Sequence, residues 1–261
     1  MINNFNIKNK IIILTGGSGN LGSIYSEHLV SNEAIVCNFD LIEPKESKLF
    51  NKKNYLFLKT DVTNKDEISS SLNLVCKKFG SPSALINNAA LDSPPGDSEK
   101  INGPFEEYPE EAWDKVIDVN LKSIFLSCQL IGNEMVKNSG GSIINISSHY
   151  GLISPDQRIY DYKENFTKPV AYSASKSGIF NLTRYLSTYW GAKNIRVNTL
   201  TLGGVFNNQD KQFVENYSKR VPLGRMAEKH EYNGVIQFLI SDASSYITGS
   251  NIVSDGGWTA W

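Results

Sequence analysis

Two polar side chains have the types and the spacing of an acid–base pair. Tyr172 and Lys176 stand four residues apart in the segment 170–190, which we predict to be a helix. Residues at this spacing share one helix face, so the ammonium would lie beside the phenol and lower its pKa from about 10. Such a tyrosine can donate and accept protons near neutral pH. The alternative is that Tyr172 and Lys176 are an incidental pair on an amphipathic helix, because a tyrosine and a lysine four residues apart also occur by chance.

A glycine-rich turn has the composition of a phosphate-binding loop. It follows the apolar run 10–15, precedes a helical pattern, and reads Gly16-Gly17-Ser18-Gly19-Asn20-Leu21-Gly22. Glycines allow a tight turn and a close approach to a pyrophosphate, whose charge then sits at the helix N-terminus. An ordinary strand–helix turn is the alternative. The position in the first strand–loop–helix unit favours dinucleotide binding.

Carboxylates end the next two predicted strands. Asp40 can accept hydrogen bonds from the adenosine ribose and would repel a 2′-phosphate, so it predicts NAD rather than NADP. Lys45 is the nearby cation that could offset this effect. Asp61, with Val62 beside it, could face the adenine amino group. Helix capping is the alternative for both carboxylates, although Asn64 is better placed to cap the helix after Asp61.

The hydrophobic pattern predicts the elements that position these residues. Strands are predicted at 10–15, 34–40, 55–60, 84–87, 142–147, 195–200 and 251–254, and helices at 20–31, 64–79, 110–137, 170–190, 208–219 and 228–240. This alternation predicts an α/β fold, a single Rossmann-type doubly wound domain over 1–261 with a seven-stranded parallel sheet and helices on both faces. Long loops at about 91–108 and 151–169 begin at carboxyl ends of strands, where ligands bind in such sheets.

The composition excludes several classes of protein. The 261 residues carry a net charge of -1, so nothing indicates a nucleic-acid partner. Cys37, Cys76 and Cys128 fit neither a disulfide framework nor a metal site. The polar N-terminus lacks the apolar core of a signal peptide, and the apolar run 11–14 is too short to span a membrane. We therefore expect a soluble cytoplasmic protein without a bound metal.

Further motifs follow one another in a fixed order. They are the glycine loop, Asn87-Asn88-Ala89-Ala90, Asn120, Ile146-Ser147-Ser148, Tyr172-Ser173-Ala174-Ser175-Lys176, and Gly256-Gly257-Trp258. As a set, and over essentially the whole chain, they resemble the short-chain dehydrogenase/reductase family. The resemblance implies an NAD(P)-dependent oxidoreductase that interconverts a secondary alcohol and a ketone by hydride transfer. It also implies a homotetramer or homodimer, with the two C-terminal tryptophans either at an interface or covering the edge of the active site.

The resemblance also implies roles for individual residues. Ser148 would hydrogen-bond the substrate oxygen, and Tyr172 would transfer the proton. Lys176 would hold the nicotinamide ribose and lower the pKa of the tyrosine. Asn120 would support a water that links Lys176 to solvent.

Cofactor contacts are implied by the same motifs. In the glycine loop they fall on Gly16, Ser18, Asn20 and Leu21. Asn88 and Ala89 would line the adenosine side, and Val205, after Gly203-Gly204, would meet the nicotinamide carboxamide. The sequence departs from the family pattern in its G-x-x-G-x-x-G spacing, in Ala90 and in Leu202, which affects fine cofactor geometry but not the chemistry.

The largest departure is the gap of 24 residues between Ser148 and Tyr172. Within the family, the longer segment, together with NIRVN (194–198), LGG (202–204) and YITGSNIVSDGGW (246–258), resembles oxidoreductases of bacterial surface-glycan and flagellin-modification sugar pathways. Its polar and aromatic composition predicts a substrate-pocket wall, with Arg158 gripping a carboxylate or phosphate and His149 and Tyr150 contacting hydroxyls. The predicted substrate is polar, and sugar-like or anionic. A solvated surface loop is the alternative.

Three functions are compatible with these motifs. The first is a dehydrogenase or reductase, since every catalytic position has the expected residue type. The second is an epimerase or dehydratase that oxidises a sugar nucleotide transiently, which would need more chain for the nucleotide. The third is a non-catalytic NAD-binding sensor. Loss of Ser148, Tyr172 or Lys176 would have favoured this function, but all three are present.

Overall fold

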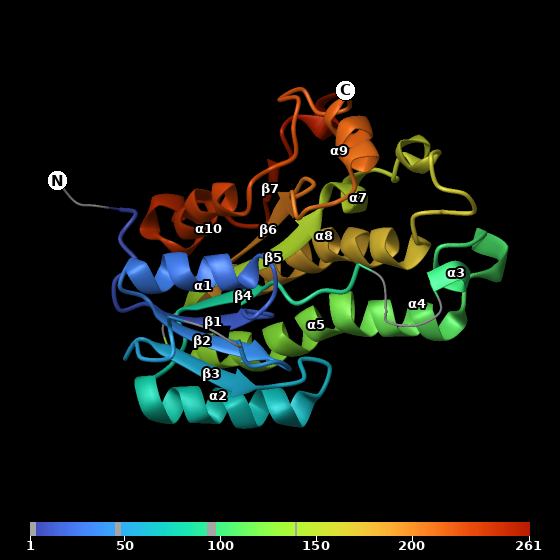
Figure 1. The fold of residues 1–261 in the computed structure, drawn as a ribbon. Coiled ribbons are helices and arrows are strands. Elements are labelled where there is room, and N and C mark those ends of the chain that lie inside the picture. Colours follow the sequence, from blue (N-terminus) through green and yellow to red (C-terminus); the bar gives the residue numbers. More distant parts are fainter. Residues whose placement is uncertain (1–3, 45–47, 93–97, 139) are drawn as a thin grey trace.

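A single parallel sheet forms the centre of the computed structural model, which describes residues 4–44, 48–92, 98–138 and 140–261 (Figure 1). The sheet has seven strands in the order β3-β2-β1-β4-β5-β6-β7. The strands are β1 (Ile11–Thr15), β2 (Ile35–Asp40), β3 (Tyr55–Lys59), β4 (Ala84–Asn87), β5 (Gly141–Ser148), β6 (Ile195–Leu202) and β7 (Asn251–Ser254). The predicted fold class is confirmed.

The strand order reverses beside β1. The chain builds β2 and β3 on one side of β1 and then crosses to place β4 on the other side, with Leu14 opposite both Asn38 and Ile86. In a sheet of this kind the connections diverge at the reversal and leave a crevice beyond the carboxyl ends of the strands. The crevice lies where Gly16 follows β1 and Asn88 follows β4.

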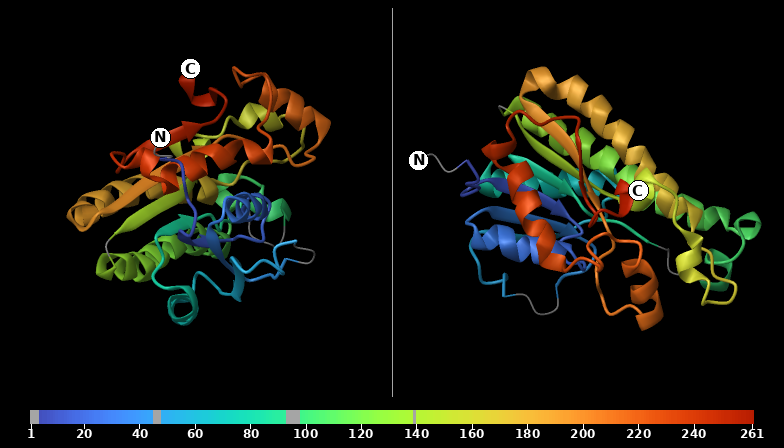
Figure 2. Two further views of the ribbon diagram at one scale, coloured as in Figure 1. Left: turned by 90° about the vertical axis from the view of Figure 1, so that its left-hand side faces the viewer. Right: turned by 90° about the horizontal axis from the view of Figure 1, so that it is seen from above.

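Helices cover both faces of the sheet (Figures 1 and 2). They are α1 (Gly22–Ser31), α2 (Lys65–Phe79), α3 (Ser98–Ile101), α4 (Glu110–Ile117), α5 (Ser123–Ser127), α6 (Asn133–Lys137), α7 (His149–Leu152), α8 (Val170–Trp190), α9 (Lys211–Ser218) and α10 (Asn233–Ile240). Tyr25 of α1 and Ile236 of α10 belong to one apolar core, and Ile68, Ile124 and Ile179 of α2, α5 and α8 belong to the other. Among the described residues, no helix is both long enough and apolar enough to cross a bilayer.

The long helix predicted at 110–137 is present as one helical run with two wider turns. The π-helical turns η2 (Asp118–Lys122) and η3 (Cys128–Gly132) separate α4, α5 and α6. Turns of this kind recur at functional sites, and η2 contains the fully buried Asn120.

Asn64 caps α2 by accepting hydrogen bonds from two backbone amides, as predicted.

The two predicted insertions contain short helices. The first includes α3 and the 3-10 turn η1 (Phe105–Glu107), while its residues 93–97 lie outside the described residues. The second includes α7 and the 3-10 turn η4 (Gln157–Tyr160). The remaining short turns are η5 (Gly191–Lys193), η6 (Lys229–Tyr232), η7 (Asp242–Ser244) and η8 (Trp258–Ala260).

The second insertion packs against α9 and the C-terminal segment in a third apolar cluster, which we call the outer cluster. It consists of the buried residues Tyr150, Ile159, Tyr160, Tyr217, Val221, Met226 and Trp258. Asn216 Nδ2 donates a hydrogen bond of 3.1 Å to the Ile159 carbonyl, and Arg220 lies 2.8 Å from Asp156. The insertion is therefore anchored to the molecule through Ile159 and Tyr160, while its residues 161–165 are exposed.

Candidate active site

Two adjoining cavities lie beyond the carboxyl ends of the strands. One, of about 610 Å³, is lined by the glycine loop and the ends of β2 and β3. The other, of about 570 Å³, is lined by residues that include Ser148, Tyr172 and Lys176. The linings share Asn20, Leu21, Asn88, Ala90 and Val205. An elongated ligand can therefore extend from one cavity into the other.

The glycine loop is pressed against the chain after β4. Gly16 has a φ of 66°, and a Cβ atom there would lie 2.8 Å from the Ala89 Cα. A Cβ atom on Gly22 would lie 2.0 Å from the Gly16 carbonyl oxygen, so α1 can begin this close to the loop only with glycine. Asn88 Nδ2 donates hydrogen bonds of 3.1 Å to the carbonyls of Thr15 and Gly16. Asn88 thus holds the glycine loop in place, and its predicted contact with the adenosine side of the cofactor stays a prediction.

Acidic groups line the far end of the first cavity. The Asp40 carboxylate accepts hydrogen bonds from the Ser18 amide at 2.9 Å and from the Ile42 amide at 3.1 Å. Asp61 and Val62 line the same cavity, and the Asp61 carboxylate accepts two bonds from Thr63. Lys45, the cation considered above, lies outside the described residues.

These observations fit a dinucleotide. The close-packed glycine loop at the start of α1 can take the pyrophosphate, and Asp40 retains acceptor capacity for ribose hydroxyls. Ser18 contributes its backbone amide to the Asp40 contact. Lys115 of α4 also lines the cavity and is a cation that reasoning from the sequence missed.

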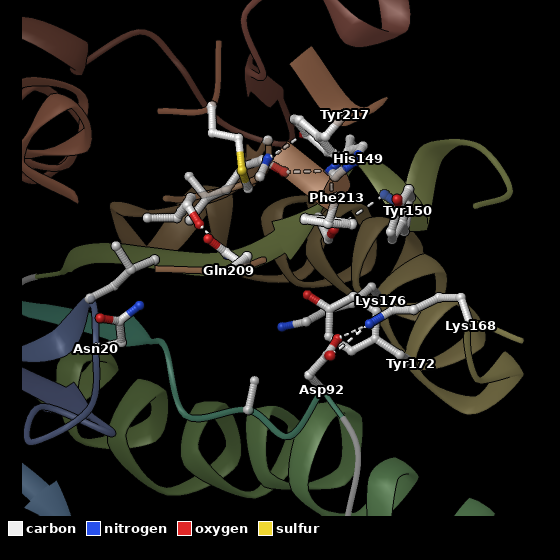
Figure 3. Close-up of a pocket in the computed structure, with 18 of the residues that line it drawn as sticks. Asn20, Asp92, His149, Tyr150, Lys168, Tyr172, Lys176, Gln209, Phe213 and Tyr217 are labelled. Atoms are coloured by element: carbon white, nitrogen blue, oxygen red, sulfur yellow. Dashed lines mark hydrogen bonds and ion pairs between the residues drawn. The ribbon is translucent and has the colours of Figure 1, made fainter. Parts of the chain in front are cut away.

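The catalytic candidates converge in the second cavity (Figure 3). Ser148 ends β5, and its Oγ accepts a 3.2 Å hydrogen bond from the Tyr150 amide. Tyr172 and Lys176 lie on α8, with the Lys176 Nζ 5.8 Å from the centre of the Tyr172 ring. The same Nζ donates a 3.0 Å hydrogen bond to the Ile146 carbonyl. The structure therefore brings together three of the four catalytic candidates in this lining, Ser148, Tyr172 and Lys176.

Burial dominates the protonation of this group. It lowers the pKa of the Lys176 ammonium to about 8, against a smaller raising effect of the Asp92 carboxylate. Burial also raises the pKa of Tyr172 above its usual value; Asp92 adds to this, and a hydrogen bond with Ser148 opposes it. The lowered phenol pKa expected from the Tyr172–Lys176 spacing is thus not seen here, because desolvation of the phenolate outweighs the favourable contacts.

Asn120 connects the site to the first insertion. Its Nδ2 donates to the Leu91 carbonyl at 2.8 Å and to Ser175 Oγ at 3.1 Å, and its Oδ1 accepts from the Leu91 amide at 2.7 Å. Ser175 immediately precedes Lys176. Asn120 therefore fixes the start of the insertion relative to α8, whereas its predicted role in holding a water remains a prediction.

The predicted substrate residues are divided by the structure. His149 and Tyr150 are buried and line the second cavity. Arg158 does not line it: its side chain is 73% exposed and bonds to Asp156 at 2.8 Å. The insertion instead contributes Tyr160, Lys163, Phe166 and Lys168 to the lining.

Further lining residues were not predicted from the sequence. Lys168 Nζ lies 2.5 and 2.6 Å from the two Asp92 oxygens and 5.2 Å from the centre of the Tyr172 ring. Gln209, Asp210, Phe213 and Tyr217 line the cavity from the α9 region. The polar and aromatic composition of the insertion indicated that its residues would line the cavity. Nothing in the sequence showed that α9 would close over the site.

Known proteins identify the family. Residues 21–259 match a family model described as enoyl-(acyl carrier protein) reductase. The chain is 32% identical over 262 residues to the NAD-dependent glycerol dehydrogenase of Listeria innocua, covering 98% of this chain and 96% of that protein. The chain belongs to the short-chain dehydrogenase/reductase family.

Other members of the family are similarly close. The post-translational flagellin modification protein A of Campylobacter coli is 30% identical, with 97% of this chain and 99% of that protein covered. A short-chain dehydrogenase from Leptospira borgpetersenii, solved with bound NAD+, has a TM-score of 0.89 and 32% identity over 99% of this chain and 97% of that chain. The predicted family is confirmed, and with it the class of an oxidoreductase that acts on CH–OH groups.

Proposed function

We propose that this short-chain dehydrogenase/reductase interconverts a secondary alcohol and a ketone on a small, polar, sugar-like substrate, with Tyr172 as the acid/base and NAD as the cofactor. The observation that carries the proposal is the convergence of Ser148, Tyr172 and Lys176 in a cavity that adjoins the one lined by the glycine loop. Bound NAD supplies the hydride acceptor for oxidation.

The side chains divide the remaining work. The Ser148 hydroxyl hydrogen-bonds the substrate oxygen and orients it toward the phenol. Tyr172 takes the hydroxyl proton during oxidation and returns it during reduction. Lys176 is held by the Ile146 carbonyl with its ammonium close to the Tyr172 ring, where its charge favours the phenolate.

Charge pairing around the substrate cavity favours a neutral polyhydroxy compound over an anion. Lys168 is paired with Asp92, and Lys163 lies 3.7 Å from Asp210. An anionic substrate would have to displace a carboxylate to gain either cation, whereas hydroxyl groups can donate to Asp92 and Asp210 as they stand. The glycerol dehydrogenase named above is a relative whose substrate is a neutral polyol.

Asp40 supports NAD over NADP. A 2′-phosphate would be desolvated against its carboxylate, which is costly. Lys115 is the cation in the described lining of this cavity that would offset part of that cost. The Leptospira relative binds NAD+. We also propose a cytoplasmic homotetramer, or failing that a homodimer, on the family resemblance.

Steady-state assays of NADH formation test the function. Purified protein would be given NAD with glycerol, tetritols and pentitols, and with hydroxy acids and sugar phosphates as charged counterparts. We expect net NADH formation with the highest kcat/KM on a neutral polyol. Isomerised or dehydrated product without net NADH would indicate an epimerase or dehydratase, and NAD binding without turnover would indicate a sensor.

A further inference from the structure

The buried imidazole of His149 connects the ends of two strands with α9. His149 follows Ser148 directly, and it is 4% exposed. Its Nδ1 lies 3.1 Å from the Leu202 carbonyl oxygen at the end of β6, and its Nε2 lies 3.4 Å from the Tyr217 hydroxyl. The same hydroxyl is 2.5 Å from the Gly204 amide. The dashed lines beside His149 and Tyr217 in Figure 3 follow this chain.

The partners define where the hydrogens lie. A carbonyl only accepts, so Nδ1 of His149 must carry the ring hydrogen toward Leu202. Nε2 is then an acceptor, and Tyr217 donates to it while accepting from the Gly204 amide. Burial, the largest effect, lowers the pKa of His149 to about 4; Asp255 raises that pKa and Lys168 lowers it by smaller amounts. The ring is therefore neutral, and both of its nitrogens are engaged by protein groups.

Packing holds the chain of hydrogen bonds in place. A Cβ atom on Gly204 would lie 2.5 Å from the Tyr217 Cζ, so the ring rests directly on the backbone of this glycine. Tyr217 also stacks on Trp258, with the ring centres 4.4 Å apart. His149 meets Tyr217 edge-on at 5.9 Å. Little freedom is left for the Gly204 backbone.

That backbone separates the two halves of the site. Gly203, Gly204 and Val205 line the second cavity, and Val205 lines the first cavity as well. We propose that His149 and Tyr217 are positioning residues that fix the backbone of 203–205 relative to Ser148, and thereby hold the nicotinamide end of the dinucleotide site in register with the catalytic serine. The inference deepens the proposed function and rests on it. It assigns His149 to the protein scaffold rather than to substrate hydroxyls.

Tyr217→Phe tests the inference because it removes the hydroxyl and keeps the packed ring. We expect the Kd of NADH, measured by fluorescence titration, to rise about fivefold to tenfold, which corresponds to about 1 to 1.4 kcal/mol, because the two hydrogen bonds of the Tyr217 hydroxyl are lost. The KM of the alcohol at saturating NAD should change by less than about twofold. A raised alcohol KM with an unchanged NADH Kd would overturn the inference, since it would make Tyr217 a substrate ligand.

Tyr232→Phe is the matched control. Its hydroxyl is also buried beside the end of β6 and bonds the Gly203 carbonyl at 3.4 Å, but it is not bonded to His149. We expect its NADH Kd to stay within about twofold of the wild type. An increase equal to that of Tyr217→Phe would show that any loss of a buried hydroxyl there weakens binding, and it would refute the specific link.

Nitrogen-15 NMR of the wild-type imidazoles gives a readout that needs no turnover. The chain has three histidines, and His149→Gln identifies the signal of interest. We expect the Nδ1–H tautomer, without protonation down to about pH 5. The Nε2–H tautomer, or titration near pH 6.5, would overturn the inference. Because this measurement and the NADH titration use no alcohol, they can succeed or fail independently of the proposed polyol activity.

Discussion

The ammonium of Lys168 lies against the carboxylate of Asp92, with 2.5 and 2.6 Å between Nζ and the two oxygens. The pair joins the start of the first insertion to the end of the second, and the same ammonium lies over the Tyr172 ring at 5.2 Å. Asp92 raises the pKa of Tyr172 and of Lys176. One ion pair therefore bears on both the shape and the electrostatics of the substrate cavity.

Asp92→Asn is expected to alter substrate preference. The change keeps the size of the side chain but leaves Lys168 without its counter-charge, so kcat/KM for a hydroxy acid should rise several-fold relative to the neutral polyol. Loss of the negative charge should also move the ascending limb of the rate–pH profile for oxidation to lower pH, because Asp92 raises the pKa of Tyr172 and the phenolate becomes easier to form without it. Rate–pH profiles on both substrates measure this.

Arg158→Ala is the control for that experiment. Arg158 is exposed and bonds to Asp156 outside the cavity lining, so kcat/KM on either substrate should change by less than about twofold. A larger loss confined to anionic substrates would restore the sequence-based assignment of Arg158 as the anion ligand.

Tyr172→Phe should reduce kcat by a factor of about 10² to 10⁴, the usual contribution of a positioned acid/base. The ring still packs, so the Kd of NADH should stay within about twofold. Tyr162→Phe is the comparison, because Tyr162 lies in the insertion and bonds Asp210 without a lysine four residues later. Substantial turnover by Tyr172→Phe would mean that another group handles the proton.

Lys176→Met should change the pH dependence of stability. The folded-state pKa of Lys176 is lowered to about 8 from 10.5, so between these pH values the unfolded chain binds more protons than the folded one. The wild type should therefore gain stability relative to Lys176→Met as the pH rises through this window, by at most about 3 kcal/mol. Urea unfolding at about pH 7 and about pH 10 tests this; equal differences between the two proteins at both pH values would contradict it.

Asp40→Asn should relax cofactor choice. An amide oxygen can still accept from the Ser18 amide, but the charge that opposes a 2′-phosphate is removed. We expect the NAD/NADP ratio of kcat/KM to fall by about tenfold or more, on the order of 1.4 kcal/mol. An unchanged ratio would show that the Asp40 carboxylate does not discriminate between the 2′-hydroxyl of NAD and the 2′-phosphate of NADP.

Light scattering should report a homotetramer at micromolar concentration. Tyr185 and Tyr189 of α8 are 61% and 65% exposed and stack on each other at 5.9 Å, and exposed aromatic pairs of this kind are enriched at interfaces. Tyr185→Glu with Tyr189→Glu should lower the mass to that of a smaller assembly. A wild-type monomer would refute the prediction.

Elements with a strong local pattern were predictable from the sequence. All seven strands were located to within about two residues, and α8 spans the predicted 170–190, because apolar runs and helix periodicity are local properties. The shared face of Tyr172 and Lys176 follows from the same periodicity. The glycine loop, Asp40 and Asp61 line one cavity, as their positions at the ends of neighbouring strands led us to expect, and its occupation by a dinucleotide stays a prediction.

Contacts between distant segments were not predictable in this way. Lys168 reaches Asp92 across 76 positions, and Tyr217 reaches His149 across 68, so neither pair leaves a mark in sequence spacing. Arg158 attracted attention as the guanidinium of the insertion, but Asp156, two residues away, satisfies it locally. The pKa of Tyr172 depends on burial, which spacing does not reveal.

The outer cluster has a consequence for how selectivity can be altered. Its members come from α7, the second insertion, α9, the segment that follows α9, and the C-terminal segment, and none of them is among the buried residues of the two cores that hold the sheet. Mutations there would reach both halves of the site, because Tyr172 packs against this cluster and the Tyr217 hydroxyl bonds the Gly204 amide. Directed evolution of new substrate ranges is therefore best confined to Tyr160 and Met226, which line the substrate cavity and lie outside the chain of hydrogen bonds from His149 to Gly204.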